Sequence, residues 1–335
     1  MHTLKELLTK TEFEKATKAP LPDFAAPMLA TLTDDYFDDP QWIYERKLDG
    51  MRCLIRIDKG KAQLFSRNEN DLSASFPEIA DALNAHKYPS LWLDGEIVAF
   101  KDNKTSFSKL QNRIHLTEED KITATNTKVY LYLFDILHHN DYDVTEIPLK
   151  TRKKLLKQSL DWQDPIRYTP HRNEDGTDFL EEACQKGWEG IIAKDATASY
   201  VHGRSKKWLK FKCSKGQELV LGGFTEPQGE RKGFGALLVG YYKEGKLQYA
   251  GKVGTGFDDA FLKTWRKKFD SIEQEESPFS NFNDTENGNN HWIKPKYVGE
   301  FAFTEWTKHN KLRHPRFLGM RNDKESNEVT KEKPQ

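Results

Sequence analysis

The residues best suited to chemistry lie in the run 45–52, which reads Glu-Arg-Lys-Leu-Asp-Gly-Met-Arg. A free lysine has a pKa near 10.4, so only about one molecule in 2,500 is neutral at pH 7. Burial or neighbouring cations can lower the pKa of Lys47 and make it a nucleophile. Taken alone, however, a Lys-x-Asp-Gly sequence is typical of a simple turn between two strands.

Four further segments carry charged or aromatic residues on apolar, strand-like runs. They are Leu93–Val98 (LDGEIV), Tyr132–Leu137 (YLFDIL), Glu189–Lys194 (EGIIAK) and Trp208–Lys212 (WLKFK). Singly, an acid at a strand end could be an ordinary ion-pair partner, and an aromatic could be a core residue. Five such segments in this order favour one shared site.

In these five segments the chain resembles the covalent nucleotidyltransferases, which comprise ATP-dependent DNA ligases, RNA ligases and mRNA capping enzymes. The resemblance covers residues 25–325. The forms EGIIAK and WLKFK, with the later GALLVGYY, YAGKVGTGF and LRHPRFLGMRNDK, are most similar to bacterial ATP-dependent DNA ligases of the end-joining type. This resemblance implies a ligase that joins a 5′-phosphate end to a 3′-hydroxyl end in DNA repair. The reaction would pass through lysyl-AMP and then through adenylylated DNA.

The resemblance also implies a role for each matching residue. Lys47 matches the nucleophile that attacks the ATP α-phosphate. The positions that match nucleotide-binding residues are Glu45, Arg52, Arg67, Glu96, Phe134, Glu189, Lys210, Lys212, Arg321, Asp323 and Lys324. Glu96 and Glu189 also match acids that hold a divalent metal, so Mg²⁺, or Mn²⁺ in its place, is expected beside ATP.

Within this set, the resemblance distinguishes parts of the nucleotide. Glu45 lies where the adenine pocket of the family begins, and Phe134 matches the aromatic residue that stacks on the base. Lys210 and Lys212 match lysines that grip the α-phosphate. Residues 321–324 match an Arg-x-Asp-Lys element of the second domain that helps to orient the leaving pyrophosphate.

Basic residues concentrate between residues 194 and 215, where seven lysines and arginines accompany one acid. Such a run could be merely a solvated face, but beside the expected site it favours contact with a DNA backbone. Within this run, Arg204, Lys206 and Lys207 are expected to bind DNA, and the resemblance implies that Arg52 and Arg67 also contact it. The expected partners are nicked or broken double-stranded DNA and, for recruitment, a bacterial Ku-type end-binding protein.

The composition of the whole chain conceals this local charge. Its 335 residues include 52 basic and 52 acidic side chains, so the formal net charge is zero, which by itself argues against a nucleic-acid partner.

No apolar run approaches the roughly 18 residues of a membrane span, and the start of the chain lacks a signal-peptide core. We therefore expect no association with membranes, and the resemblance to bacterial ligases implies a monomer in the bacterial cytoplasm, associated with the nucleoid.

The cysteines and histidines give weaker signals. Cys53, Cys184 and Cys213 are scattered and lack Cys-x-x-Cys spacing, which indicates a reducing compartment and no zinc ribbon. The adjacent His138 and His139 show no other ligand spacing, and we expect them in a loop.

Apolar patterns and turn signals predict the elements that must position these residues. Strands that carry or flank site residues are predicted at 42–47, 51–57, 91–100, 129–137, 191–194 and 208–212, and helices at 151–160, 179–186 and 257–269. Residues 75–78 predict a helix start with a capping box.

Composition changes near residue 214 and predicts four parts. They are an N-terminal extension (1–24), an α+β domain (25–214), a small β-rich domain (218–324) and a disordered tail (325–335). The resemblance implies that the α+β domain is a nucleotidyltransferase domain of the ATP-grasp-like class and that the β-rich domain is a β-barrel OB fold. A hinge at 214–217 would let the second domain approach ATP and later release DNA. The extension is too short for the DNA-encircling domain of larger relatives, so we expect a minimal ligase core.

Two other classes of function stay open at the level of sequence. An RNA ligase or a GTP-dependent capping enzyme shares the lysine and acid motifs, and these residues do not define a sugar preference. A non-catalytic nucleic-acid-binding protein could retain the fold, but the presence of Lys47, Glu96, Glu189 and Lys210 argues against loss of chemistry.

Overall fold

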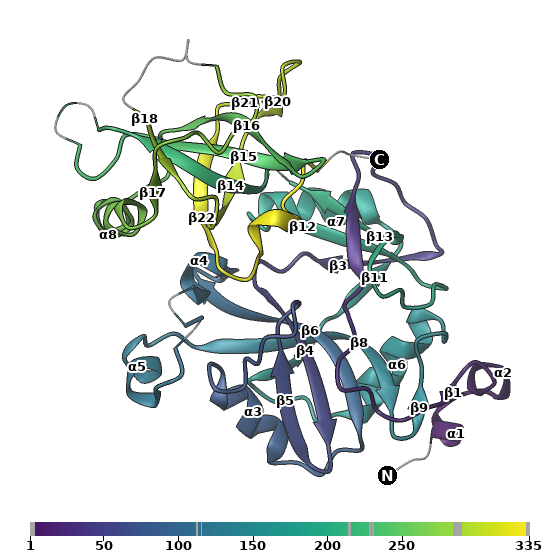
Figure 1. Cartoon of the computed structure of the whole chain (residues 1–335). Coiled ribbons are helices and arrows are strands. Elements are labelled where there is room, and N and C mark those ends of the chain that lie inside the picture. The colour runs from purple at the N-terminus through teal and green to yellow at the C-terminus, as the bar shows by residue number, and fades with distance from the viewer. Residues whose placement is uncertain are drawn as a thin grey trace. The chain divides into compact units, whose positions relative to one another are not determined.

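Branched and aromatic residues fill the longest apolar runs of the chain, and in the computed structural model these runs form the long strands (Figure 1). The structure describes residues 4–111, 113–114, 116–213, 216–227, 229, 231–283 and 290–332. The chain divides after Cys213 into two compact units, here called unit 1 and unit 2. No helix in the described ranges is both long enough and apolar enough to cross a membrane.

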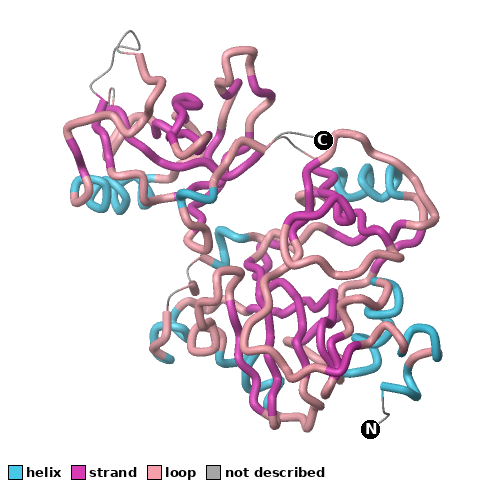
Figure 2. The backbone as a smooth tube through the Cα atoms, turned by 45° about the vertical axis from the view of Figure 1, so that its right-hand side comes forward, coloured by secondary structure: helices cyan, strands magenta, loops and turns pink. Residues whose placement is uncertain are grey.

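The larger sheet of unit 1 has eight strands. In spatial order they are β1 (Thr17–Lys18), β9 (Tyr142–Asp143), β8 (Val129–His139), β6 (Leu91–Lys101), β4 (Met51–Asp58) and β5 (Lys61–Phe65), with β10 (Ile166–Tyr168) beside β8 and β7 (Lys104–Thr105) beside β6. The helices α3 (Pro77–Asn84) and α6 (Leu149–Ser159) bury apolar side chains in the core beneath this sheet, and α4 (Phe107–Leu110) and α5 (Glu119–Ala124) lie in the connection from β7 to β8. Helices lie around the strands of unit 1 in Figure 2.

The smaller sheet of unit 1 explains how distant motifs meet. Its order is β11 (His171–Asn173), β3 (Trp42–Arg46), β12 (Gly190–Asp195), β13 (Arg204–Lys212) and β2 (Leu29–Leu32). The register sets Glu45 opposite Ile192, and Ile192 opposite Lys210. Helix α7 (Gly176–Gln185) contributes Phe179, Leu180 and Ala183 to the core of this sheet.

A cluster of large side chains joins the two sheets of unit 1. Trp92 and Phe134 come from the larger sheet, Trp208 comes from the smaller one, and Met28 and Tyr200 belong to the same cluster. All five are buried. The motif residues therefore lie near a rigid junction between two sheets, and not on one extended surface.

The first residues of the chain pack onto unit 1. Leu4 in α1 (Leu4–Leu7) is 3% exposed and belongs to the main core. Glu12 in α2 (Lys10–Phe13) forms a reciprocal capping box with Thr9 at the N-terminus of that helix and accepts a hydrogen bond from Thr151 at 2.6 Å. Strand β1 pairs with β9. Over its described residues, the segment 1–24 is thus an integral part of unit 1.

Unit 2 is a seven-stranded sheet with one long helix. The main path is β16 (Lys246–Val253), β15 (Leu237–Lys243), β14 (Gly216–Thr225), β18 (Asn290–Ile293) and β17 (Glu273–Gln274), and β19 (Val298–Ala302) joins β14 to β22 (Arg316–Arg321). Helix α8 (Asp259–Asp270) buries Leu262, Trp265 and Phe269, and β20 (Glu305–Trp306) with β21 (Leu312–Arg313) forms a separate hairpin. Among the described strands, no pairing closes the sheet into a ring.

The tail differs from the disordered segment that the composition predicts. Residues Ser326–Glu328 form a 3₁₀ turn, η1, and Val329 is only 6% exposed. The carbonyl of Val329 accepts a hydrogen bond from the backbone N–H of Tyr242 at 2.7 Å. The buried side chain of Val329 and the backbone pairing with the end of β15 therefore hold this segment on unit 2. Residues 333–335 lie outside the described residues.

Candidate active site

Lys47 directly follows β3 and faces the start of β12. Its backbone N–H donates to the carbonyl of Gly190 at 2.9 Å, and its ammonium group lies 2.5 Å from Oε1 of Glu189. The Lys212 ammonium group lies 3.9 Å from the same oxygen. The lysine and glutamate of the closer pair are 18% and 20% exposed. Two ammonium groups thus converge on one carboxylate that solvent and a ligand can reach.

The turn after Lys47 is fixed by hydrogen bonds and by close packing. The backbone N–H of Asp49 donates to Thr105 Oγ1 at 3.1 Å, and its carboxylate accepts from the N–H of Phe107 at 3.0 Å, at the start of α4. A Cβ atom on Gly50 would lie 2.3 Å from the carbonyl oxygen of Ile97 and 2.9 Å from Cγ of Glu96. Only glycine allows this approach to β6, which brings Glu96 beside the turn.

Glu45 is fully buried between two lysines. Its carboxylate accepts hydrogen bonds from Lys153 of α6 and from Lys194 of β12, the latter pair at 2.6 Å. Burial raises the pKa of this carboxyl, but the two ammonium groups outweigh burial and lower it below its ordinary value. Burial lowers the pKa of Lys194. Glu45 is therefore held as a structural anion behind Lys47.

Lys153 has no place in the family motifs, and sequence analysis missed it. A signal existed, because Leu149, Lys153 and Leu156 share one face of α6 at the spacing of a buried helix stripe. A lysine on such a stripe requires a buried acid as its partner.

Arg52 is held by three residues that are not among the predicted site residues: Asp94, Met28 and Tyr200. It donates two hydrogen bonds of 2.5 Å to Asp94 and one of 3.0 Å to the carbonyl of Met28. Tyr200 donates to the same carboxylate at 2.6 Å. Burial lowers the pKa of the Arg52 guanidinium, but Asp94 outweighs burial and raises it. Asp94 directly precedes Gly95 and Glu96 in the motif LDGEIV, and this position could have indicated a role at the site.

Phe134, which the resemblance matches to the residue that stacks on the base, is more deeply buried than an open stacking surface would be. It is 8% exposed and meets Trp208 edge to face, with ring centroids 6.0 Å apart. Arg52 lies 4.9 Å and Lys194 4.3 Å from its ring centroid. In this structure the ring belongs to the cluster between the two sheets and has cations beside it.

The predicted DNA-binding residues are spread over unit 1. Arg204 and Lys206 are exposed at the start of β13, and Lys207 pairs with Asp195 at 2.8 Å. At the usual strand rise, they lie on the order of 20 Å from Lys212 at the other end of β13. Arg67 is half-buried in the turn after β5, and Lys210 is half-buried in β13. Lys194 is buried, so the basic run 194–215 does not form one face.

Arg321, Asp323 and Lys324 form one ion-pair cluster within unit 2. Arg321 donates to both oxygens of Asp323, at 2.9 and 2.8 Å, and lies 3.3 Å from Glu300. Glu218 lies 4.0 Å from Arg321 and 3.5 Å from Lys324. Burial raises the pKa of Asp323, but Arg321 outweighs burial and lowers it. The cluster joins the end of β22 to β14 and β19.

The described residues contain no group of three or more His, Cys, Asp or Glu side chains that could hold a metal ion. Magnesium at a nucleotide site needs only one or two carboxylates, because the substrate phosphates and water complete its shell. Glu189 beside Lys47 and Glu96 beside Gly50 fit that smaller requirement.

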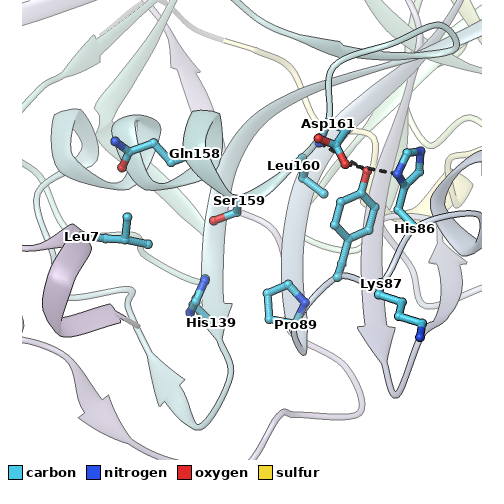
Figure 3. A pocket seen from close by; sticks show the side chains of 10 residues that line it. Leu7, His86, Lys87, Pro89, His139, Gln158, Ser159, Leu160 and Asp161 are labelled. Atoms are coloured by element: carbon cyan, nitrogen blue, oxygen red, sulfur yellow. Dashed lines mark hydrogen bonds and ion pairs between the residues drawn. The ribbon is translucent and has the colours of Figure 1, made fainter. Parts of the chain in front are cut away.

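A separate cavity of about 490 Å³ lies elsewhere in unit 1 (Figure 3). Its lining comes from α1, the segment before β6, the end of β8 and the end of α6, and includes Leu7, His86, His139 and Asp161. Burial lowers the pKa of His139 to about 4, so this ring is neutral at pH 7. None of the predicted site residues lines the cavity.

Two family models match the chain. The model described as ATP dependent DNA ligase domain matches residues 27–212, and the model described as ATP dependent DNA ligase C terminal region matches residues 230–324. Together they include every predicted site residue.

Relatives and a solved structure agree with the family models. The multifunctional non-homologous end joining protein LigD of Pseudomonas aeruginosa is 36% identical over 95% of this chain and 38% of its own length. The LigD of Mycobacterium tuberculosis is 33% identical over 92% of this chain and 40% of its own length. The structure of "mycobacterial DNA ligase D complexed with ATP and MES" is 30% identical, with a TM-score of 0.65, over 92% of this chain and 98% of that one. The chain spans about two fifths of the LigD relatives, and it belongs to the ATP-dependent DNA ligase family.

Proposed function

We propose that this chain is an ATP-dependent DNA ligase that transfers AMP to Lys47, then to the 5′-phosphate of a DNA end, and finally seals the 3′-hydroxyl to that end. The convergence of Lys47 and Lys212 on Glu189 carries the proposal. It supports a site in which a nucleophilic amine and a phosphate-binding cation lie side by side. The family membership supports the choice of ATP and DNA.

The first step requires Lys47 to attack the α-phosphorus of ATP as a neutral amine. The ammonium group must first lose a proton to water. The neighbouring ammonium group of Lys212 favours that loss, and the Glu189 carboxylate 2.5 Å away opposes it. The new bond joins Lys47 Nζ to phosphorus, the bond to the β-phosphate oxygen breaks, and pyrophosphate leaves. Lys212 and Lys210 offset the negative charge of the transferring group. A divalent cation held by Glu96 and Glu189 would add charge neutralisation there.

We assign the nucleotide pocket to the cluster that joins the two sheets. Phe134 and Glu45 would border the base, and Arg52, with Asp94 behind it, would meet the ribose or a phosphate. Because Asp94 and Tyr200 fix Arg52 before ligand binds, the guanidinium loses little side-chain freedom on binding. Arg67 and residues 204–207 would extend the contacts to DNA.

The finer architecture belongs to the same proposal. We assign unit 1 to the ATP-grasp-like nucleotidyltransferase class and unit 2 to the OB fold, with a hinge at residues 214–217. Ser214 and Lys215 of that hinge lie outside the described residues. Rotation about it would bring Arg321, Asp323 and Lys324 to the pyrophosphate in the first step.

The biological setting follows from the relatives. LigD of Pseudomonas aeruginosa is named as a multifunctional non-homologous end joining protein, which supports a role in end joining. We further propose recruitment to DNA ends by a Ku-type end-binding protein. The bacterial origin of these relatives supports action in a bacterial cytoplasm. We also propose that the enzyme is a monomer and acts on DNA at the nucleoid.

The decisive experiment asks for the covalent intermediate. The full chain is incubated with Mg²⁺ and α-labelled ATP or GTP, and the denatured protein is examined for retained label. We expect label from ATP, none in Lys47→Ala, and unchanged labelling in Lys59→Ala, which alters an exposed turn. The labelled protein should then seal a nicked duplex.

Other outcomes would identify another function. Label from GTP alone would favour capping chemistry, and sealing confined to RNA strands would favour an RNA ligase. Absence of label with either nucleotide would overturn the proposal and leave a nucleic-acid-binding protein.

A further inference from the structure

Two of the three cysteines are joined in unit 1. Cys184 lies in the last turn of α7, Cys213 directly follows β13, and the structure links them by a disulfide with a Cα–Cα distance of 5.2 Å. This distance falls within the roughly 4.4–6.8 Å that disulfides span. Cys53, the third cysteine, is buried in β4 as a free thiol.

The disulfide closes a loop that contains part of the candidate active site. Cys184 and Cys213 are 29 residues apart in sequence, and Glu189, Lys210 and Lys212 lie between them. The backbone N–H of Cys213 donates to the carbonyl of Glu189 at 3.1 Å. Cys213 is therefore the chain neighbour of Lys212 and the hydrogen-bond partner of Glu189.

The other end of the disulfide is fixed to the smaller sheet. Helix α7 buries Phe179, Leu180 and Ala183 in the same core as Ile191 and Phe211 of that sheet. Cys184 directly follows the buried Ala183. The disulfide therefore links the C-terminal end of β13 to a helix that is packed firmly against the sheet.

The disulfide is also accessible to small thiols. Cys184 is exposed, as are the next three residues of the chain, Gln185, Lys186 and Gly187, and Cys213 is partly exposed. Buried structural disulfides resist reduction, whereas exposed ones are the labile and regulatory class.

We propose that Cys184 and Cys213 form a reversible oxidation site, whose disulfide holds Glu189 and Lys212 in place for AMP transfer to Lys47. Low-molecular-weight thiols of the glutathione type are its redox partner. The inference rests on the proposed function of Lys47, and it concerns the rate of the first step alone.

The exchange takes place in two balanced steps. A glutathione thiolate attacks Sγ of Cys184, the Sγ–Sγ bond breaks, and the Cys213 thiolate leaves and takes up a proton. A second glutathione thiolate attacks the mixed disulfide, which releases oxidised glutathione and the Cys184 thiolate, and this also takes up a proton. Two electrons pass from two glutathione molecules to the protein, and oxidised glutathione reverses the sequence.

Reduction removes the covalent anchor at the end of β13. Lys212 still pairs with Gly190 in the sheet, but the strand can then fray from its last residue inwards. Because small displacements of positioned groups reduce rates strongly, we expect reduction to slow lysyl-AMP formation on the order of 10-fold.

The test compares redox states of the full chain. Samples are equilibrated anaerobically with reduced and oxidised glutathione at a series of ratios. Alkylation and mass spectrometry give the disulfide fraction, and a single turnover with labelled ATP gives the rate of adduct formation. The rate should follow the disulfide fraction. Cys184→Ser and Cys213→Ser should both show the slow rate at every ratio, while Cys53→Ala, which leaves the disulfide intact, should follow the unaltered chain.

Three results would overturn the proposal. They are equal rates in both redox states, failure of the disulfide to form in excess oxidised glutathione, and a change confined to the melting temperature, which would mark a purely structural cross-link. A complete absence of adduct in both states is a different result, because it would refute the proposed function itself together with its redox control.

Discussion

The two ion-pair clusters of this chain are built in opposite ways. In unit 1, the ammonium groups of Lys47 and Lys212 share Glu189. In unit 2, three carboxylates, those of Glu218, Glu300 and Asp323, surround Arg321 and Lys324, so that three negative charges meet two positive ones. The first cluster has an excess of positive charge that a phosphate can offset. The second is already more than neutralised by its own acids.

This difference suits the cluster of unit 1 to reaction with a ligand and the cluster of unit 2 to stabilising the fold. Lys47 and Glu189 are each about one-fifth exposed, and the carboxylate keeps Lys212 as a partner if Lys47 is removed. The side chains of Arg321 and Asp323 are only 12% and 9% exposed. If Arg321 and Lys324 are to orient pyrophosphate, as the family resemblance implies, they must first leave these carboxylates.

The sharpest test removes the central cation from each cluster. Lys47→Ala should abolish the covalent adduct but lower the free energy of unfolding by only about 1 kcal/mol, because Glu189 keeps Lys212 as a partner and is not left unpaired. Arg321→Ala should lower that free energy by about 3–5 kcal/mol, because it leaves buried carboxylates uncompensated. Denaturant unfolding, with fluorescence and circular dichroism as two probes, measures both. An Arg321→Ala protein as stable as the unaltered chain would contradict the comparison.

A smaller effect should appear as acid sensitivity of unit 2. Because the pKa of Asp323 is lowered in the folded state, its contribution to stability is present above the unfolded pKa of about 3.9 and is lost as the pH falls through the folded value. The stability gap between the unaltered chain and Asp323→Asn should therefore be constant near pH 6 and narrow below about pH 4. Glu244→Gln, in an exposed turn, is the control, and it should show no such gap.

The smallest effect concerns the exposed cations at the start of β13. Replacing Arg204, Lys206 and Lys207 by glutamine should weaken the salt dependence of binding to nicked DNA, by up to about 2.7 in the slope of log K against log salt, since each phosphate contact contributes about 0.9. Self-adenylylation should be unchanged, because these residues lie far from Lys47. The same charge change at Lys59, Lys61 and Lys87 is the control. An unaltered slope would remove residues 204–207 from the DNA surface.

Local sequence patterns predicted most strands that hold the candidate site. The strands β3, β4, β6 and β13 lie where their aromatic and branched residues indicate. These patterns gave wrong predictions where contacts with residues distant in sequence determine the local structure. His138 and His139 lie in β8 and are buried, not in a loop, because β6 and β9 pair on either side of them.

The start of α3 shows the same limit. The predicted capping box at residues 75–78 does not form, because Phe76 is the N-cap residue and no side chain caps the helix. Glu78 instead receives two hydrogen bonds from Arg113, at 2.9 and 3.0 Å, and Arg113 also donates to the carbonyl of Ser75. A charged hydrogen bond from a residue 35 positions away outweighed the local cap.

The sequence alone determined which side chains can react, since the order of Lys47, Glu96, Glu189 and Lys210 along the chain identifies a family of nucleotidyltransferases. Only the tertiary structure decided how each charge is balanced. Glu45 and Lys153 are 108 residues apart, Arg52 and Asp94 are 42 apart, and Cys184 and Cys213 are 29 apart. These pairs depend on strand register and on packing between two sheets, and neither is encoded by a local pattern of residue types.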